Sequence, residues 1–355
     1  MPNSNVDIDI RIDGRAGRIT LNRPQALNAL TYKMCLEIEA ALDLWRDDPV
    51  VKLVIIDANG DKAFSAGGDI QEMYDTGKAG DYAYGQKFWF DEYRINAKIA
   101  GYPKPYVAFM QGFTMGGGVG VSCHGSHRIV GETSQIAMPE CGIGLVPDVG
   151  GSFLLASAPG HAGEYLGLTS ARMAASDAIY AGFADFFIAQ DRWRTLIEIL
   201  CVSGDVFLVQ NYASSEMRPD PGPLQTEKQA IDILFSGGNA ATISERLKAC
   251  DTEFAAGALK NLGRNSPLSL ACATEMLHQL RPNNDIAIAL NLEYRFTFRA
   301  MQHGDFIEGI RAAIIDRDRK PHWKHDSLTE VLDDEVAQML APLGNNGLNL
   351  MEQLA

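Results

Sequence analysis

The sequence of 355 residues is poor in basic side chains, since 31 lysines and arginines stand against 45 aspartates and glutamates. The formal net charge of −14 argues against nucleic acid or an anionic membrane surface as a general partner. No uninterrupted apolar run approaches the length that spans a membrane. We therefore expect a protein that binds neither nucleic acid nor a membrane. A small anionic ligand is still allowed, because it needs only a local cluster of cations.

The six cysteines form no CxxC pair and no dense framework, so we expect buried or free thiols in a reducing compartment. Residues 1–11 show neither an apolar signal core nor an arginine-rich amphipathic pattern, so no targeting segment is predicted and a cytoplasmic location is expected. Nucleotide-binding motifs are also missing. No GxGxxG follows a predicted strand and GxxxxGK[ST] does not occur, so neither a Rossmann nor a P-loop site is supported.

Strands and helices alternate in the first part of the chain. Alternating apolar residues over 6–21, around a turn at Gly14, predict a hairpin, and 53–56 reads as a buried strand. Between them, apolar residues at helical spacing predict a helix over 31–47 with Thr31 as its N-cap. Strand, helix and strand at this spacing predict a parallel crossover and hence an α/β fold.

The second part of the chain is predicted to be mainly helical. Proline and glycine interrupt all periodicity near 217–223, and apolar residues recur at helical spacing beyond residue 224. A chain of this length accommodates one large core and a smaller appendage. We therefore expect a core over 1–205 and a helical C-terminal region over 206–355.

Two glycine-rich turns are the clearest candidates for a binding feature. In each, a predicted strand leads through glycines into a helix: 63–70 contains Gly67 and Gly68, and 106–123 contains Gly116–Gly118. Such turns point backbone N–H groups at an anion and let a ligand approach with no Cβ in the way. A single glycine-rich turn is more often structural than functional. Two of them can supply two donors to one oxygen, which is the usual composition of an oxyanion hole.

Three acids are the candidate reactive groups. Glu140 lies in an apolar neighbourhood, 137–143, which is predicted to raise its pKa and suit it to proton transfer. Asp148 follows on the same loop, whose path is set by glycine and proline. Glu92 lies in an aromatic-rich predicted helix, 82–100, whose aromatic side chains are expected to pack in the core. Carboxylates held beside an oxyanion-binding backbone are suited to acyl chemistry.

A serine nucleophile and a metal site are weaker alternatives. Ser122 lies in a segment, 120–124, that lacks the second glycine of GxSxG. Cys123, His124 and His127 could ligate a metal on paper, but no remote acid partner is identified, and packing or surface roles are favoured. The sequence therefore predicts no metal ligands.

Four segments, in this order, resemble the enoyl-CoA hydratase/isomerase superfamily, the crotonases: NRPQALNAL at 22–30, AFSAGGD at 63–69, KPYVAFMQGFTMGGGVG at 104–120 and MPECGIGLVPDVGG at 138–151. The resemblance implies a spiral of ββα units followed by C-terminal helices. It also implies an acyl-CoA thioester as the bound partner, with the thioester carbonyl between the N–H groups of Gly68 and Gly117. The loops implied to contact CoA contain Gln25, Ala26, Leu27, Ala66, Asp69 and Ile70.

Within this superfamily the sequence most resembles the 3-hydroxyisobutyryl-CoA hydrolases. Hydratases of the family typically carry two catalytic glutamates, and this chain has Gly120 at the first position and Glu140 at the second. Asp148 stands where hydratases commonly have glycine, and Glu92, in FDEYRIN, is similar to a hydrolase pattern. The resemblance implies hydrolysis of a short branched 3-hydroxyacyl-CoA thioester, most closely 3-hydroxyisobutyryl-CoA to 3-hydroxyisobutyrate and CoA in valine catabolism. No cofactor is implied, because CoA is part of the substrate.

The resemblance also implies roles for the acids. Glu140 either activates water or attacks the thioester directly, and both routes stay open. Asp148 holds the 3-hydroxyl group of the substrate or helps protonate the leaving thiolate, and Glu92 orients that end of the substrate. The alternatives are an enoyl-CoA hydratase or isomerase that uses Glu140 alone, and a non-catalytic acyl-CoA-binding protein. A homo-oligomer is compatible with the family, whose members often form trimers.

Overall fold

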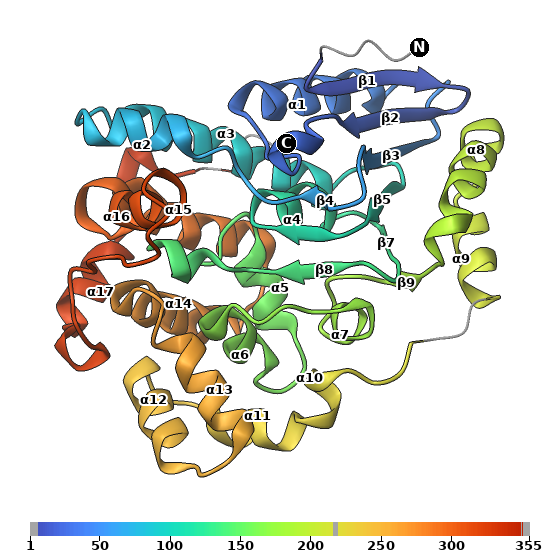
Figure 1. Ribbon diagram of the computed structural model, residues 1–355. Coiled ribbons are helices and arrows are strands. Elements are labelled where there is room, and N and C mark those ends of the chain that lie inside the picture. The colour runs from blue at the N-terminus through green and yellow to red at the C-terminus, as the bar shows by residue number, and fades with distance from the viewer. Residues whose placement is uncertain (1–5, 216–218, 349, 351–355) are drawn as a thin grey trace. The chain divides into compact units, whose positions relative to one another are not determined.

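The computed structural model describes residues 6–215, 219–348 and 350 (Figure 1). By its contacts the chain divides into two compact units. The first unit consists of 1–69, 95–137 and 173–222. The second consists of 70–94, 138–172 and 223–355. Each unit thus combines segments that are far apart in the sequence, and each is considered by itself below.

The described part of the first unit contains two sheets. The strands are β1 (Ile8–Asp13), β2 (Ala16–Leu21), β3 (Leu53–Ala58), β4 (Ala63–Ser65), β5 (Tyr106–Met110), β6 (Phe113–Met115), β7 (His127–Val130), β8 (Gln135–Ala137) and β9 (Phe186–Phe187). The larger sheet has the order β1-β2-β3-β5-β7-β9, and its neighbours are parallel except for the hairpin of β1 and β2. The smaller, parallel sheet has the order β4-β6-β8.

The strands between β3 and β8 repeat one pattern. In each of the pairs β3 and β4, β5 and β6, and β7 and β8, the first strand joins the larger sheet and the second joins the smaller one. Helix α4 (Gly117–Ser122) follows the middle pair directly. In the larger sheet β3, β5 and β7 pair in parallel, with Val54 opposite Tyr106 and Val107 opposite His127. The predicted α/β fold with repeated ββα units is confirmed.

One face of the larger sheet is covered by α8 (Trp193–Ser203) and α9 (Phe207–Ser214), which Figure 1 shows beside the strands. The strand side chains in this core alternate along the chain, because successive residues of a strand point to opposite faces. Burying each such aliphatic side chain contributes about 1.5–3 kcal/mol. The core residues include Leu53, Ile55, Val107, Phe109 and Ile129 from the strands and Trp193, Leu196, Leu200 and Val209 from the helices.

Two local predictions about the first unit are confirmed. The β1–β2 hairpin turns at Gly14, whose φ of 56° lies in the left-handed region. Helix α1 (Tyr32–Arg46) begins after Thr31, whose hydroxyl accepts the N–H of Met34 at 3.2 Å. The remaining helical elements of this unit are η1 (Pro24–Ala26), α7 (Ala175–Tyr180) and η3 (Gln190–Arg192).

The second unit is built from helices. They are α2 (Gln71–Lys78), α3 (Ala83–Ala100, whose last residues belong to the first unit), η2 (Glu140–Ile143), α5 (Gly151–Ser157), α6 (Ala162–Thr169), α10 (Pro223–Thr226), α11 (Lys228–Leu234), α12 (Ala240–Ala249), α13 (Glu253–Leu262), α14 (Pro267–Leu280), α15 (Ile286–His303), α16 (Phe306–Ile310), η4 (Arg311–Ile315), η5 (Leu328–Glu330), α17 (Asp333–Met339) and η6 (Gly344–Asn346). Residues beyond 224 are thus mainly helical, as predicted.

Short polar side chains fix where the two long helices of this unit begin. The Ser266 hydroxyl accepts the N–H of Ser269 at 3.1 Å and is followed by a proline at the first position of α14. The Asp285 carboxylate accepts the N–H of Ala287 at 2.8 Å and that of Ile288 at 3.2 Å at the start of α15. These caps satisfy N–H groups that a helix leaves unpaired at its start.

The structure bears on the predictions about cysteines, membrane-spanning helices and the domain boundary. All six cysteines lie in the described ranges and are free thiols, five of them buried, as predicted. In the described ranges no helix combines the length and apolar character needed to cross a membrane. Residues 1–5 lie outside the described residues, and so does part of the predicted boundary near 217–223. The division into 1–205 and 206–355 stays a prediction.

Candidate active site

The two glycine-rich turns lie side by side in the first unit. A Cβ built on Gly67 would lie 3.4 Å from the carbonyl oxygen of Met115 and 3.9 Å from the amide nitrogen of Gly117. Gly67 has a φ of 111°, which side chains other than that of glycine rarely allow. A Cβ on Gly118 would come within 2.6 Å of the carbonyl oxygen of Ser65. Helix α4 therefore rests directly on the backbone of β4.

The amide N–H groups of Gly68 and Gly117 have no hydrogen-bond acceptor among the described residues. Leu30 and Gly68 form an isolated parallel β-bridge. Its two hydrogen bonds run from the N–H of Leu30 to the carbonyl oxygen of Gly67 and from the N–H of Asp69 to that of Leu30, both at 2.8 Å, so the N–H of Gly68 itself is not used. Gly117 is the first residue of α4, where helical N–H groups have no partner within the helix. Unpaired amides away from water are costly. Two of them on adjoining turns form a site suited to an oxygen acceptor.

Most residues predicted to contact CoA surround the first glycine turn. Gln25 and Ala26 lie in η1. Leu27 follows with a φ of 51°, and its carbonyl oxygen accepts the N–H of Ala66 at 2.9 Å. Asp69 lies next to Gly68 in the same unit. The sixth predicted residue, Ile70, precedes α2 in the second unit. Their contacts with CoA stay a prediction.

Two residues that the sequence analysis did not single out hold this loop. The buried side chain of Asn28 donates to the carbonyl oxygens of Asn59 and Ala63, both at 2.9 Å. Arg23 donates to the Asp69 carboxylate at 2.9 Å. The motif NRPxxxNAL contains both residues and could have indicated them. A buried asparagine such as Asn28 needs several hydrogen-bond partners and therefore tends to hold the loops around it.

The second unit contains a cluster of four buried carboxyl groups, Glu92, Glu140, Asp148 and Glu293, each at most 4% exposed. Burial is the largest cause of the raised pKa values of the other three, and the charge of Asp148 raises each of them further. The structure therefore brings the three predicted acids together within one unit. It adds Glu293, which was not among the acids that the sequence indicated.

Asp148 is held by a tyrosine. The Tyr93 hydroxyl donates to Oδ2 of Asp148 at 2.7 Å and lies 3.4 Å from Oγ1 of Thr297. Burial raises the pKa of Asp148, while the hydrogen bond from Tyr93 opposes that shift. Tyr93 is fully buried, as predicted for the aromatics of this helix, and its phenol provides a polar contact that the prediction missed. A buried tyrosine normally needs such a partner.

Glu140 is the first residue of η2 and has one carboxyl oxygen that no neighbouring group satisfies. Burial, and then the charge of Asp148, raise the pKa of Glu140 well above its ordinary value, as its apolar neighbours predicted. Its Oε2 is buried and has no hydrogen-bond partner among the described residues. Oε1 of Glu92 is in the same situation, and burial raises the pKa of Glu92 too. Unpaired buried carboxyl oxygens are candidates for contact with a substrate.

Glu293, on α15, holds the turn that follows Asp148. Its two oxygens accept the N–H of Gly150 at 2.8 Å, the N–H of Ser152 at 3.0 Å and the hydroxyl of Ser152. The turn includes Val149 with a left-handed φ of 54°, which is unfavourable for a β-branched residue, whereas Gly150 tolerates its φ of 78°. The hydrogen bonds with Glu293 help to hold this conformation. The signal in the sequence was a glutamate in the middle of an apolar helical pattern.

The effect of Glu293 on stability should depend on pH. Burial raises the pKa of Glu293 from 4.5 to about 8, so the folded protein keeps a proton that the unfolded chain releases between these values. The resulting stability is fully present below the unfolded pKa and is lost as the pH rises toward 8, by about 1.4 kcal/mol per pH unit. We expect Glu293→Gln to show a smaller fall in melting temperature between about pH 5 and pH 8. Equal slopes in both proteins, or an equal change in the exposed-site control Glu245→Gln, would contradict this.

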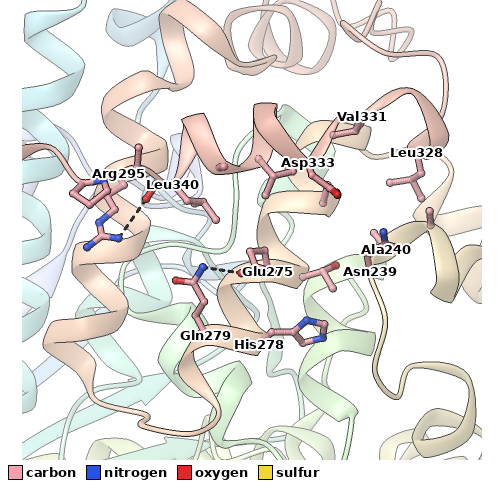
Figure 2. A pocket seen from close by; sticks show the side chains of 17 residues that line it. Asn239, Ala240, Glu275, His278, Gln279, Arg295, Leu328, Val331, Asp333 and Leu340 are labelled. Atoms are coloured by element: carbon pink, nitrogen blue, oxygen red, sulfur yellow. Dashed lines mark hydrogen bonds between the residues drawn. The ribbon is translucent and has the colours of Figure 1, made fainter.

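A groove of about 630 Å³ lies elsewhere in the second unit, between α14, α15 and α17 (Figure 2). On α14, Gln279 donates to Glu275 at 2.8 Å, and on α15 Arg295 donates to the carbonyl oxygen of Leu340 at 3.3 Å. The polar groups facing the groove are thus partly engaged with one another. None of the predicted site residues lines it.

Comparison with known proteins places these features in context. A family model described as enoyl-CoA hydratase/isomerase matches residues 16–340. The chain is similar to the mitochondrial 3-hydroxyisobutyryl-CoA hydrolase of Xenopus tropicalis, with 41% identity over 95% of this chain and 89% of that protein. The human mitochondrial 3-hydroxyisobutyryl-CoA hydrolase is 36% identical over 94% of this chain and 88% of its own length.

Two solved structures cover nearly the whole chain. An enoyl-CoA hydratase from Rhodobacter sphaeroides is 56% identical, with a TM-score of 0.93 over 97% of this chain and 100% of that chain. A carnitinyl-CoA dehydratase from Mycobacterium thermoresistibile is 36% identical, with a TM-score of 0.92 over 98% of this chain and 99% of that chain. These two proteins are thus described as a hydratase and a dehydratase, whereas the relatives above are described as hydrolases.

The expected cytoplasmic location is wrong on this comparison. The hydrolases from Xenopus tropicalis, chicken and human are all named as mitochondrial proteins. The expectation rested on the composition of the first residues and on free thiols. Free thiols indicate a reducing environment and do not distinguish one reducing compartment from another.

Proposed function

Because the chain belongs to the enoyl-CoA hydratase/isomerase family, we propose that it is a thioester hydrolase that converts 3-hydroxyisobutyryl-CoA and water to 3-hydroxyisobutyrate and CoA, a step of valine catabolism. The observation that carries this proposal is the buried pair Glu140 and Asp148 in a chain with Gly120 where the family's hydratases carry their first glutamate. The names of relatives about 40% identical support the same reaction.

In the proposed reaction the thioester carbonyl oxygen accepts hydrogen bonds from the N–H groups of Gly68 and Gly117. These N–H groups stabilise the negative charge that forms on the oxygen when the carbonyl carbon is attacked, an effect of about 3 kcal/mol per donor. Glu140 removes a proton from the attacking water, or attacks directly to form an anhydride that water then opens. In both routes the C–S bond breaks and the thiolate of CoA leaves with a proton.

Asp148 and Glu92 act on the acyl end of the substrate. In this proposal Asp148 holds the 3-hydroxyl group or helps to protonate the leaving thiolate, and Glu92 orients the acyl chain. Their raised pKa values support such roles, since a carboxyl group that keeps a proton near neutral pH can donate a hydrogen bond as well as accept one. The proposed reaction uses only water and these groups, so no cofactor is needed. A homo-oligomer stays a prediction.

Hydration of an enoyl-CoA is the second candidate, because the protein of known structure with 56% identity is described as an enoyl-CoA hydratase. Addition of water across a double bond needs a proton taken from water and a proton given to carbon. With Gly120 at the first glutamate position, Glu140 would have to do both. The buried Asp148, absent from the typical hydratase pattern, favours hydrolysis.

Two assays on the same protein separate these functions. We expect rapid release of thiol from 3-hydroxyisobutyryl-CoA, followed with a thiol reagent, and at least about a hundredfold slower loss of enoyl absorbance with crotonyl-CoA, the margin that one acid–base group typically supplies. Fast consumption of crotonyl-CoA without thiol release would show a hydratase instead. Binding of CoA with no turnover in either assay would favour a non-catalytic acyl-CoA-binding protein.

A further inference from the structure

A cavity of about 780 Å³ in the second unit has no role in the proposed reaction. It is open to the surface, and segments distant in sequence contribute to its wall: η2, the end of α6, the end of α13, and the stretch from α16 through η4 to residue 321. Its volume is within the range of sites that bind small molecules. The cavity is therefore a candidate ligand site, and its lining indicates the kind of ligand.

The lining is cationic in a chain that is acidic overall. Arg172, Arg264 and Arg319 line the cavity, and no aspartate or glutamate belongs to its described lining. The whole chain has a net charge of −14, so a surface cavity whose charged side chains are all positive is unusual here. Like charges brought together repel unless an anion lies between them. The lining is thus arranged for a negatively charged ligand.

Two of these arginines have no protein partner for their charge. Neither the guanidinium of Arg264 nor that of Arg319 forms an ion pair or hydrogen bond with any described residue, and both residues are exposed. Their backbones are held, since Arg264 donates its N–H to Asn261 at 3.2 Å and Arg319 donates its N–H to Ala312 at 3.1 Å. Both arginines thus present free guanidinium groups from positions fixed by the main chain.

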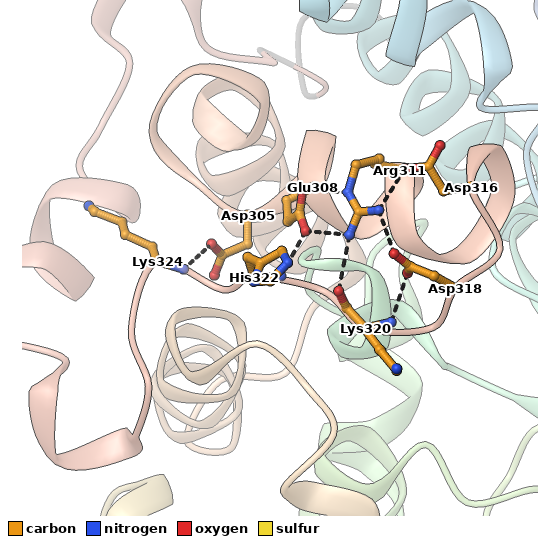
Figure 3. A network of polar contacts seen from close by, with 8 residues as sticks. All are labelled: Asp305, Glu308, Arg311, Asp316, Asp318, Lys320, His322 and Lys324. Atoms are coloured by element: carbon orange, nitrogen blue, oxygen red, sulfur yellow. Dashed lines mark hydrogen bonds and ion pairs between the residues drawn. The ribbon is translucent and has the colours of Figure 1, made fainter.

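The loop that carries Arg319 is fastened on both sides by Arg311, as Figure 3 shows. Arg311 donates to the Asp318 carboxylate at 2.8 Å and to the Lys320 carbonyl at 3.0 Å, and Lys320 donates its N–H to Asp318 at 2.9 Å. Arg311 also pairs with Glu308. The acids near the loop are therefore engaged by Arg311, and Arg319 between them remains available.

Two lining residues adopt left-handed backbone conformations, Ser170 with a φ of 56° and Arg319 with a φ of 55°. Such conformations cost residues other than glycine roughly 1–2 kcal/mol, and they tend to persist where a site requires them. Ser170 and Asn265, which are joined by a hydrogen bond of 3.5 Å, add polar groups to the wall. Ile143 and Pro321 add apolar surface.

We propose that this cavity binds a phosphorylated small molecule of nucleotide size. Guanidinium groups match phosphate oxygens with paired hydrogen bonds, hydroxyl and amide groups supply further donors, and the apolar wall fits the organic part of such a molecule. A concave site in an acidic protein disfavours a nucleic acid strand. Gly142 and Ile143 of η2, with Pro139 just before it, form one wall, so the ligand contacts the turn that holds the candidate catalytic acid Glu140.

The test is binding of ADP, inorganic pyrophosphate and CoA to the full chain, measured by titration calorimetry at constant ionic strength. We expect ADP to bind the unaltered protein, and Arg264→Ala with Arg319→Ala to weaken binding by about tenfold for each arginine. Replacing both by lysine, which keeps the charge and loses the paired geometry, should weaken binding less. Pyrophosphate tests the phosphate contacts alone. CoA should bind the double variant unimpaired, because its proposed site uses other residues.

Arg317→Ala is the matched control, since Arg317 lies on the same loop with a φ of 57° and does not line the cavity. We expect it to leave ADP binding unchanged, and an unchanged melting temperature of each variant shows an intact fold. The proposal is overturned by no binding of ADP or pyrophosphate at millimolar concentration, or by binding that the double variant leaves unchanged. Equal weakening by Arg317→Ala would also overturn it, because it would show attraction by general charge alone. Each outcome is independent of thioester hydrolysis.

Discussion

Glu140→Gln is expected to lower kcat for hydrolysis of 3-hydroxyisobutyryl-CoA by about 10²- to 10⁴-fold, the range that loss of a general base produces. The loss is larger if Glu140 is the nucleophile, because a glutamine amide neither attacks the thioester nor accepts a proton. The measurement is thiol release at saturating substrate. KM should change little, since the substitution keeps the shape of the side chain.

The fold should tolerate this change. Burial and the charge of Asp148 disfavour the ionised form of Glu140. A neutral glutamine removes the cost of a buried negative charge, so we expect the melting temperature to be equal or higher. Glu198→Gln, on the exposed face of α8, is the control and should retain full activity. Near-normal turnover by Glu140→Gln would remove Glu140 from the reaction. A collapse of the melting temperature would show that the residue acts through stability.

The second large effect is expected for Gly118→Ala. The added methyl group would lie 2.6 Å from the carbonyl oxygen and 2.9 Å from the Cβ of Ser65, both fully buried, so α4 must move away from β4. That movement displaces the N–H of Gly117 from the adjoining turn. Loss of one oxyanion donor lowers kcat by about 10²- to 10³-fold, which thiol release will measure. We also expect a lower melting temperature, because overpacking costs typically 1–3 kcal/mol.

A matched glycine is available as the control for Gly118→Ala. Gly257 lies inside α13, and a Cβ there would have no heavy atom within 4 Å. Gly257→Ala should therefore leave kcat unchanged and stabilise the helix by about 1 kcal/mol. If Gly118→Ala kept normal kcat despite a lower melting temperature, the position of the Gly117 N–H would not matter for the reaction. The two glycine turns would then be only structural.

The sequence was informative wherever a property depends on near neighbours. The Thr31 cap and the buried strand predicted over 53–56, which the structure extends to 58, follow from local sequence patterns. The glycine turns follow from residues that tolerate positive φ. The raised pKa of Glu140 follows from apolar residues beside it in the chain. The prediction of a cytoplasmic location failed because amino-acid composition does not specify the cellular compartment.

By itself, the sequence determined an α/β fold, a mainly helical second part, two glycine turns and three candidate reactive acids, and its resemblance to the crotonases implied the repeated ββα units. Only the tertiary structure decided which distant groups meet: Tyr93 reaches Asp148 across 55 positions, Glu293 holds the Asp148 turn across more than 140, and arginines from separate segments line one cavity. The reason is that spacing along a helix or strand fixes the face a side chain occupies, whereas packing between elements fixes which faces meet.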